Sequence, residues 1–392
     1  MTLKVTVAAV FLFLATIASS NAQVNYAERF RAAAAQYKVL MRRLPAERFP
    51  KTYFAVNDSL GTSDSGWWCS GFYPGTLLQL YRETKDPAIL TEANRMLGLL
   101  AKEQYNTGTH DLGFMMYCSF GNALKIDPRP EYKQILINSA KSLAKRFDPK
   151  VGCIRSWNGK PGDFLVIIDN MMNLELLFWA TKVTGDSSFY KIAVTHANTT
   201  MKNHFRPDHS SYHVLTYDEQ TGAVKHKGTA QGYADESAWA RGQAWGLYGY
   251  TVMYRETHDQ KYLDQANHIA SFILDNPNLP SDKILYWDYN APNIPNALRD
   301  VSAAAITASA LLELRKYNSG AIAQKYLSNA KAILKTLSSS PYLAPGGTNG
   351  GFILQHSVGH LPAKSEVDVP LTYADYYYME ALTRLKGVEI DH

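Results

Sequence analysis

Two aspartates have neighbours that suit acid–base chemistry. Asp169 directly follows the apolar run 164–168, and Asp111 directly follows His110. A carboxyl group held among apolar side chains has its ionised form disfavoured, which raises its pKa toward the range useful for a general acid that later acts as a base. The alternative is that each aspartate caps a helix, because Asp is a favoured N-cap residue. We predict that both are catalytic, Asp169 because of its apolar neighbours.

Aromatic residues gather with glycine and polar residues where the chain is expected to pass from a loop into a helix. Flat apolar rings beside polar groups suit sugars, which have an apolar face and a rim of hydroxyls, although the same rings elsewhere anchor a core. Each ring taken singly fits a core equally well, but as a set they predict a carbohydrate site. The set is Trp67, Trp68, Phe72, Trp157, Trp239 and Trp245.

Arg241 lies four residues before Trp245. Residues four apart share one face of a helix, so this guanidinium and indole can line one wall together. An arginine in that setting is predicted to clamp a ligand carboxylate. The alternative is a surface ion pair with Asp235 or Glu236.

Helical periodicity dominates the chain, whereas alternating runs typical of strands are few and short. The pattern predicts twelve helical segments, at 26–43, 68–84, 88–103, 111–125, 130–147, 168–184, 187–204, 236–256, 260–275, 299–317, 321–337 and 370–386.

A weak repeat indicates how these helices are arranged. The end of one helix, a short polar turn and the start of the next recur at 81–86, 180–186, 254–259 and 314–319, with a looser copy at 124–127. Five such hairpins leave one helix at each end. Pairing those two helices would close an all-α ring of six hairpins, an (α/α)6 barrel. The alternative, an open solenoid, would need more regular repeats and polar end caps.

The amino terminus is typical of a cleavable secretory signal. Lys4 precedes the apolar stretch 5–17, and Ser20-Asn21-Ala22 offers a cleavage site. The stretch is shorter than the roughly 20 apolar residues that cross a bilayer. We therefore expect residues 1–22 to be a signal peptide and 23–392 a single catalytic domain that is periplasmic or secreted, without membrane insertion.

Composition excludes several other classes of function. The net charge of +5 arises from interspersed basic and acidic residues, so no nucleic-acid partner is predicted. Cys69, Cys118 and Cys153 lack metal-binding spacing and fit small buried apolar residues. The sequence also lacks G-x-S-x-G, H-E-x-x-H and G-x-x-x-x-G-K-[ST] motifs. No metal or cofactor is predicted, and nothing indicates an oligomeric state.

Four motifs follow one another along the chain. They are Trp68-x-x-Gly71-Phe72-x-Pro74-Gly75, His110-Asp111-x-Gly113-Phe114, Ile168-Asp169-Asn170-x-Met172-Asn173 and Gln231-Gly232-x-x-Asp235-x-Ser237-x-Trp239-x-Arg241-Gly242-Gln243-x-Trp245, and the segment 375–382 fits with them. In combination, over about residues 65 to 385, they resemble the unsaturated glucuronyl hydrolases of glycoside hydrolase family 88.

This resemblance implies an (α/α)6 barrel and an activity. The family removes the 4,5-unsaturated uronic acid from the non-reducing end of oligosaccharides left by polysaccharide lyases. By resemblance, Asp169 would protonate carbon 4 of the vinyl ether and activate water for attack at carbon 5, after which the hemiketal rearranges and the aglycone leaves. Asp111 would hold the sugar hydroxyls and assist.

The resemblance also implies a set of substrate-binding residues and no metal. The set is Trp68, Phe72, His110, Trp157, His213, Gln231, Trp239, Arg241 and Trp245. His213 and Gln231, taken without the resemblance, would each fit a structural role.

The expected substrate is a glycosaminoglycan disaccharide, in part because the chain is predicted to be exported and is mildly basic. Lys364 and Ser365 could contact a sulfate, the alternative being a solvated loop. Three rival functions stay open: an unsaturated rhamnogalacturonyl hydrolase acting on pectin fragments, an ordinary inverting glycosidase that uses Asp111 and Asp169, and a non-catalytic carbohydrate-binding toroid.

Overall fold

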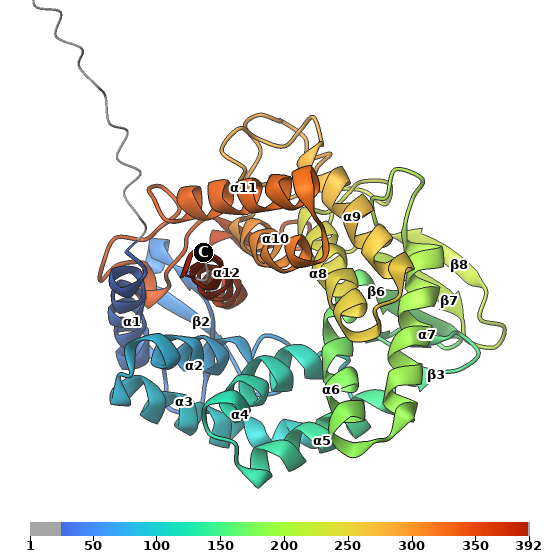
Figure 1. Ribbon diagram of the computed structural model, residues 1–392, viewed down its shortest axis with the longest axis horizontal. Helices are drawn as coiled ribbons and strands as arrows, with labels where there is room; N and C mark the ends of the chain where they lie inside the picture. Colours follow the sequence, from blue (N-terminus) through green and yellow to red (C-terminus); the bar gives the residue numbers. More distant parts are fainter. Residues whose placement is uncertain (1–24, 391–392) are drawn as a thin grey trace, which may run out of the picture.

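The computed structural model describes residues 25–390, and their α-helices form an inner and an outer ring (Figure 1). The outer helices are α1 (Tyr26–Arg43), α3 (Pro87–Leu100), α5 (Pro130–Ala144), α7 (Ser187–His204), α9 (Gln260–Leu274) and α11 (Gly320–Leu337). The inner helices are α2 (Phe72–Thr84), α4 (Asn122–Ile126), α6 (Leu174–Thr184), α8 (Ala240–Thr257), α10 (Val301–Leu314) and α12 (Thr372–Ile390). This (α/α)6 barrel confirms the predicted fold. The predicted signal peptide, residues 1–22, lies outside the described residues.

The two rings differ in how their helices are buried. Every residue of α10 is buried, and its sequence, VSAAAITASALLEL, has no strongly polar face. The outer helix α11 buries only Tyr326, Ala330, Ile333, Leu334 and Leu337. That spacing of three and four residues gives an apolar stripe on one side, as expected for a helix with one face in solvent.

The first and last helices close the ring. The Tyr26 hydroxyl of α1 donates a hydrogen bond to Glu389 of α12 at 2.5 Å, and the Tyr37 hydroxyl donates to Asp375 at 3.2 Å. Helix α12 also packs against both α2 and α10. The inner ring is therefore continuous, which excludes the open solenoid.

The repeat seen in the sequence corresponds to a shared turn between hairpin helices. Lys85, Gly185 and His258 each follow an inner helix in the left-handed backbone conformation. The next residues, Asp86, Asp186 and Asp259, cap the following outer helix by accepting a backbone N–H bond. These turns are short because a left-handed residue ends one helix and the aspartate at once begins the next.

Short strands occupy most of the long connections that lead from an outer helix to the next inner helix. They form three two-stranded sheets, β1 (Phe49–Phe54) with β2 (Ser59–Ser63), β3 (Phe147–Asp148) with β4 (Cys153–Ile154), and β9 (Ser357–His360) with β10 (Ser365–Val369). A four-stranded antiparallel sheet contains β5 (Trp157–Asn158), β6 (Asp163–Ile167), β7 (Val214–Asp218) and β8 (Val224–Gly228). The long connections thus meet at the end of the barrel where the inner helices begin.

Four predicted helices begin differently from the sequence pattern, and all four lie at that end; the one predicted at 68–84 becomes helical only at Phe72. The segment predicted as helix 111–125 is a π-helix, η3 (Gly113–Gly121), followed by α4. The segment 168–184 starts with a 3-10 helix, η4 (Ile168–Asn173), before α6. The segment 236–256 becomes helical only at Ala240. Irregular helical turns of this kind are frequent at functional sites.

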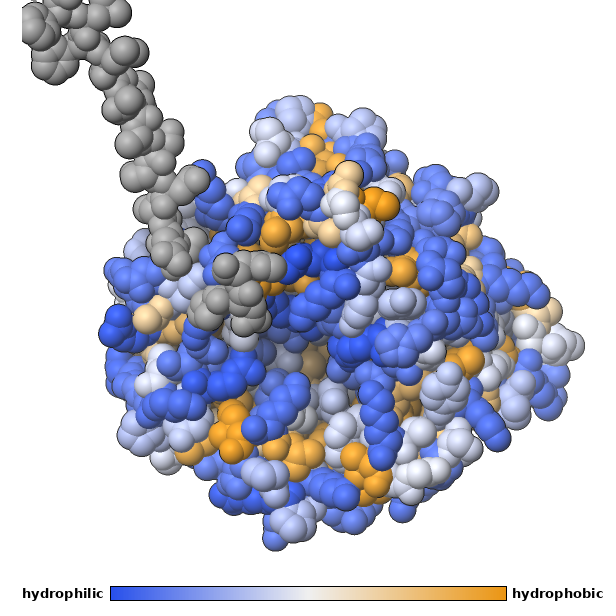
Figure 2. Space-filling model, viewed as in Figure 1, coloured by the Kyte–Doolittle hydropathy of each residue, from blue (hydrophilic) through white to orange (hydrophobic). Residues whose placement is uncertain are grey.

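The face shown in Figure 2 is mostly hydrophilic, with apolar residues in small separate groups. Within residues 25–390, each helix is either too short or too polar to span a bilayer. The three cysteines are free, and Cys69 and Cys153 are buried. In the same part of the chain, no group of three or more His, Cys, Asp or Glu side chains is arranged to hold a metal ion.

Candidate functional site

A cavity of about 490 Å³ opens among the long connections. Seven of the residues selected from the sequence line it, and they come from four different connections and the start of α8. They are Trp68, His110, Asp111, Trp157, Asp169, Gln231 and Arg241. Indole rings and two carboxyl groups therefore share one space, as a site for a sugar requires.

Asp169 lies on the floor of this cavity and does not cap a helix. It belongs to η4, where Ile167 is the N-cap residue and no side chain caps the helix. The Asp169 side chain is 11% exposed, and burial raises its pKa to about 7. Arg241 and the Trp245 indole oppose this rise in pKa, whereas Asp111 adds to it. The carboxyl group can therefore be protonated or ionised near neutral pH.

Asp111 enters the cavity beside Asp169 and is held by its sequence neighbours. Thr109 Oγ1 donates a hydrogen bond to Asp111 Oδ2 at 2.8 Å, and His110 Nε2 lies 3.4 Å from Oδ1. His110 is buried, and this burial lowers its pKa, so the imidazole is neutral at neutral pH. Both ring nitrogens of His110 are buried without a hydrogen-bond partner within residues 25–390, which suits a side chain that meets a polar ligand.

The two segments that carry the aspartates are locked together. Asn173 Oδ1, in η4, accepts a hydrogen bond from the backbone N–H of Phe114, in η3, at 3.0 Å. A Cβ atom at Gly113 would lie 2.5 Å from the Asn173 Cα, so only glycine allows this approach. The relative position of Asp111 and Asp169 is consequently fixed by the backbone.

His213 faces Asp169 in a defined tautomer. Its Nδ1 accepts hydrogen bonds from the backbone N–H groups of Ala230 and Gln231, at 3.1 and 3.2 Å. A neutral ring then carries its proton on Nε2, which lies 3.7 Å from Asp169 Oδ2. Burial, assisted by the charge of Arg241, holds the pKa of His213 well below its usual value. His213 therefore presents a neutral N–H group toward the Asp169 carboxyl.

Arg241 is fixed by four hydrogen bonds in the cavity wall. Nη1 donates to Asp300 Oδ2 at 2.7 Å and to the Val358 carbonyl at 2.6 Å. Nη2 donates to Gln231 Oε1 at 2.7 Å and to the Gly359 carbonyl at 2.6 Å. All four terminal N–H bonds of Arg241 therefore already donate to acceptors of the protein. A ligand carboxylate would be attracted by the positive charge of Arg241 without accepting a hydrogen bond from these groups.

The alternative surface ion pair of Arg241 with Asp235 or Glu236 is wrong. The arginine is 2% exposed, and its partner Asp300 is fully buried. Asp300 also caps α10 by accepting a hydrogen bond from the backbone N–H of Ser302. Capping alone would account for an aspartate that precedes a helix. The pairing joins residues 59 apart in the sequence, which no local pattern reveals.

The family model described as Glycosyl Hydrolase Family 88 matches residues 46–388. The chain belongs to this family. An unsaturated glucuronyl hydrolase of Formosa agariphila is 48% identical over 346 residues, which cover 88% of this chain and 86% of that protein. An unsaturated chondroitin disaccharide hydrolase of Streptococcus pneumoniae is 33% identical over 331 residues, covering 82% of each chain. The crystal structure of an unsaturated glucuronyl hydrolase specific for heparin superposes with a TM-score of 0.90 at 46% identity, covering 93% of this chain and 98% of that one.

This family 88 protein is therefore a glycoside hydrolase, and it removes an unsaturated uronic acid from oligosaccharides. The comparisons confirm the resemblance read from the four sequence motifs.

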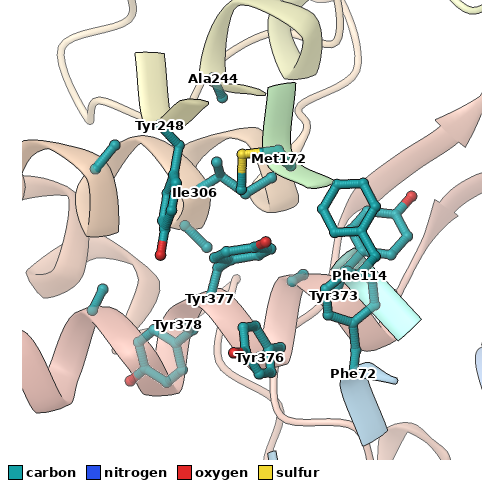
Figure 3. Packing of buried hydrophobic residues seen from close by; sticks show 14 of the residues in the cluster. Phe72, Phe114, Met172, Ala244, Tyr248, Ile306, Tyr373, Tyr376, Tyr377 and Tyr378 are labelled. Atoms are coloured by element: carbon teal, nitrogen blue, oxygen red, sulfur yellow. The ribbon is translucent and has the colours of Figure 1, made fainter. Parts of the chain in front are cut away.

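Four residues predicted to bind the substrate lie behind the cavity wall in the family 88 enzyme. Phe72 is fully buried and packs with Phe114 and Tyr373 (Figure 3). Trp239 and Trp245 are also buried and do not line the cavity, and the His213 side chain is 0% exposed. These side chains thus lie in the layer beneath the residues that line the cavity, and their contact with the substrate stays a prediction. The local sequence does not distinguish side chains that face the cavity from side chains that pack directly behind them.

The buried rings hold the polar residues in position. The Trp239 ring lies 4.4 Å from the His213 ring, centroid to centroid, and 4.5 Å from the Arg241 guanidinium carbon. Phe72 contacts Trp68 edge-on at 5.8 Å. An aromatic layer of this kind restricts the rotamers of the residues that meet the ligand.

Nine further residues line the cavity that the sequence did not indicate as substrate-binding. Those beyond the predicted set are Lys51, Trp67, Ile167, Gly359, His360, Ala363, Ser365, Glu366 and Tyr373. Trp67 belonged to the aromatic cluster and Glu366 directly follows Ser365, but neither Lys51 nor Glu366 was itself part of a motif. Of the two residues suggested for sulfate, Ser365 lines the cavity, whereas Lys364 is exposed and does not.

Proposed function

We propose that the enzyme hydrates the vinyl ether of the unsaturated uronic acid, with Asp169 as general acid and then general base. The supporting observation is a buried carboxyl group on the cavity floor, with a pKa of about 7. Its Oδ2 atom has no hydrogen-bond partner among the described residues. Asp169 Oδ2 can therefore exchange a proton with a bound ligand. A pKa of about 7 suits a group that acts first as an acid and then as a base near neutral pH.

The proposed reaction has three steps. Asp169 gives its proton to carbon 4, and the double bond between carbons 4 and 5 becomes an oxocarbenium-like centre at carbon 5. The Asp169 carboxylate then takes a proton from water while the water oxygen bonds to carbon 5. The resulting hemiketal opens to a ketone at carbon 5 and a hemiacetal at carbon 1, and this hemiacetal collapses to an aldehyde as the aglycone leaves as an alcohol. Asp169 ends protonated, as it began.

Asp111 would stabilise the positive charge that develops at carbon 5. Its carboxylate is already oriented by Thr109 and lies beside His110, so little reorganisation is needed when the charge forms. The rule that relates carboxyl separation to retention or inversion does not apply, because the anomeric carbon is not attacked first.

The pH profile should show Asp169 as the group that must be protonated. Since burial raises its pKa to about 7, we expect kcat/KM to fall as the pH rises above that value, approaching tenfold per pH unit. The sign follows from the acid role: a carboxylate cannot protonate carbon 4. Initial rates of vinyl ether loss between pH 5 and 9 measure this. A profile that rises from pH 6 to pH 9 would contradict the assignment.

We further propose glycosaminoglycan disaccharides of the heparin type as substrates. The support is the similarity to the heparin-specific structure, at 46% identity, against 33% for the chondroitin disaccharide hydrolase. Export of the chain after loss of residues 1–22 is part of this proposal.

The substrate is tested with unsaturated heparin, chondroitin and rhamnogalacturonan disaccharides, followed by the loss of absorbance of the conjugated double bond. We expect the highest kcat/KM for the heparin disaccharide. Turnover of the rhamnogalacturonan disaccharide alone would identify the enzyme as the pectin-directed rival. Activity on saturated but not unsaturated sugars would favour an ordinary inverting glycosidase.

A further inference from the structure

Arg146 lies behind the cavity wall, and each of its three guanidinium nitrogens donates to a backbone carbonyl. Nε donates to Arg155 at 2.8 Å, Nη2 to Ser156 at 3.1 Å and Nη1 to Thr107 at 2.7 Å. The side chain is half-buried, just beyond the end of α5, and does not line the cavity. Among the residues that the structure describes, it forms no ion pair with an Asp or Glu. Because its three acceptors are neutral, this arginine keeps its full positive charge.

The three carbonyls belong to two connections that each bring a residue into the cavity. Thr107 precedes Asp111 by four residues, in the connection from α3 to α4. Arg155 and Ser156 directly precede Trp157, in the connection from α5 to α6. Asp111 and Trp157 both line the cavity. A single guanidinium group therefore ties together two segments of the cavity wall.

The segment 154–157 is also held from the side of Asp169. Asn170 Nδ2, next to Asp169 in η4, donates to the Ile154 carbonyl at 2.8 Å. The backbone N–H of Ile167 donates to Ser156 Oγ at 3.0 Å. Within residues 25–390, no hydrogen bond joins 106–112 directly to 154–158. The guanidinium group is thus the link that attaches the Asp111 segment to this fixed part of the wall.

The charge of Arg146 acts on the two residues at the tip of that segment. Burial lowers the pKa of His110, Asp111 opposes this effect, and Arg146 adds to it. Burial and Arg155 lower the pKa of Arg146 itself, whereas Asp111 opposes the change. A nearby cation disfavours a protonated imidazole and favours an ionised carboxyl group. Arg146 therefore favours a neutral His110 beside an anionic Asp111.

We propose that Arg146 is a positioning residue, which holds Asp111 in place as a carboxylate although it does not itself meet the substrate. A charge that is oriented before the reaction stabilises a transition state without reorganisation, and Arg146 supplies that orientation from behind the wall. This inference rests on the proposed function, in which Asp111 stabilises the positive charge at carbon 5. The effect of Arg146 on the rate should accordingly pass through Asp111.

The first test measures kcat and KM for an unsaturated disaccharide. In Arg146→Met we expect kcat to fall by about 10- to 100-fold, the larger value being the cost of displacing a group at the reaction centre by about 1 Å. KM should change by less than about threefold, since the lost interaction belongs to the transition state. Arg29→Met is the matched control: Arg29 is also half-buried and donates to a backbone carbonyl, that of Ser338, but does not line the cavity. This control should keep the wild-type kcat.

A double-mutant cycle tests whether the effect passes through Asp111. In the Asp111→Asn background, adding Arg146→Met should lower kcat by less than about threefold, because residues that act as a unit are not additive. A loss of the same size in both backgrounds would show that Arg146 acts independently of Asp111 and would overturn the proposal. Wild-type kcat in Arg146→Met would overturn it as well.

A conservative variant and an NMR titration separate this role from a merely structural one. Arg146→Met should move the midpoint of the His110 imidazole titration to higher pH, because Arg146 lowers the pKa of His110. Arg146→Lys keeps the charge, but one ammonium group cannot span three carbonyls; the midpoint should stay near that of the wild type while kcat still falls. An unmoved midpoint in Arg146→Met, or wild-type kcat in Arg146→Lys, would contradict the proposal. The second outcome is decisive even if Arg146→Met does not fold.

The design separates this proposal from the proposed function. If Asp111→Asn alone keeps the wild-type kcat, the role given to Asp111 in the proposed function fails. If Asp111→Asn is slow and Arg146→Met is not, only the positioning role of Arg146 fails. Thermal unfolding of each variant establishes that the compared proteins are folded.

Discussion

Replacing Asp169 by Asn is expected to slow turnover of an unsaturated disaccharide by about 100- to 10,000-fold, the usual contribution of a general acid–base group. Asparagine has the shape of the acid but cannot give a proton to carbon 4. Binding should survive, because the buried Oδ2 atom is one of several polar groups that face the cavity. Single-turnover rates and equilibrium titration of the same variant measure the two quantities.

A matched control for Asp169→Asn is Asp375→Asn. Asp375 is also fully buried, and burial raises its pKa to about 7. It accepts hydrogen bonds from the backbone N–H groups of Ile353 and Leu354, and it does not line the cavity. Asp375 has a raised pKa but does not line the cavity, so we expect Asp375→Asn to turn over the substrate at the wild-type rate. Retention of wild-type turnover by Asp169→Asn would contradict the mechanism, and an equal loss in both variants would attribute the effect to folding.

Replacing Arg241 by Met is expected to destabilise the protein by about 3–5 kcal/mol, the usual cost of removing one partner from a buried ion pair. Asp300 would be left without its cation in a fully buried position, and the Val358 and Gly359 carbonyls would lose their donor. The pKa of Asp169 should also rise, since Arg241 lowers it. The fall of kcat/KM with rising pH would then begin at a higher pH than in the wild type.

Urea denaturation measures the loss of stability, with Arg129→Met as the control. Arg129 pairs with Asp127, but both side chains are about half exposed, at 51% and 48%, and such pairs contribute only about 0–1 kcal/mol. Adding Asp300→Asn to Arg241→Met should recover part of the loss, because the unpaired charge is removed. Equal unfolding midpoints for Arg241→Met and the wild type would contradict the role given to this pair.

The helices could be predicted wherever local sequence determines them. α1 and α7 begin and end where the periodicity and the flanking residues indicated. The turns at Asp86, Asp186 and Asp259 explain why a repeat was visible, since each combines a left-handed residue with a capping aspartate. Periodicity and capping act over a few residues, so one sequence is enough to read them.

The site could be predicted only in part, because much of it depends on contacts between distant segments. The apolar run before Asp169 indicated a buried carboxyl group, and the structure places it on the cavity floor. Asp300 gave no signal, since it acquires its role from a partner more than 50 residues away. The π-helix after Asp111 was likewise hidden, and nothing in the local sequence shows that its first residue, Gly113, packs closely on Asn173.

The central claim is that a proton reaches carbon 4 before the glycosidic bond breaks. Turnover in D₂O, followed by proton NMR from the first turnovers, tests it most directly. We predict that the vinyl proton signal declines no later than the free hexosamine appears, and that the first-formed product carries deuterium at carbon 4 in a single orientation. Release of the hexosamine before the vinyl signal declines, with deuterium entering both orientations, would show direct displacement at the anomeric carbon and contradict the account.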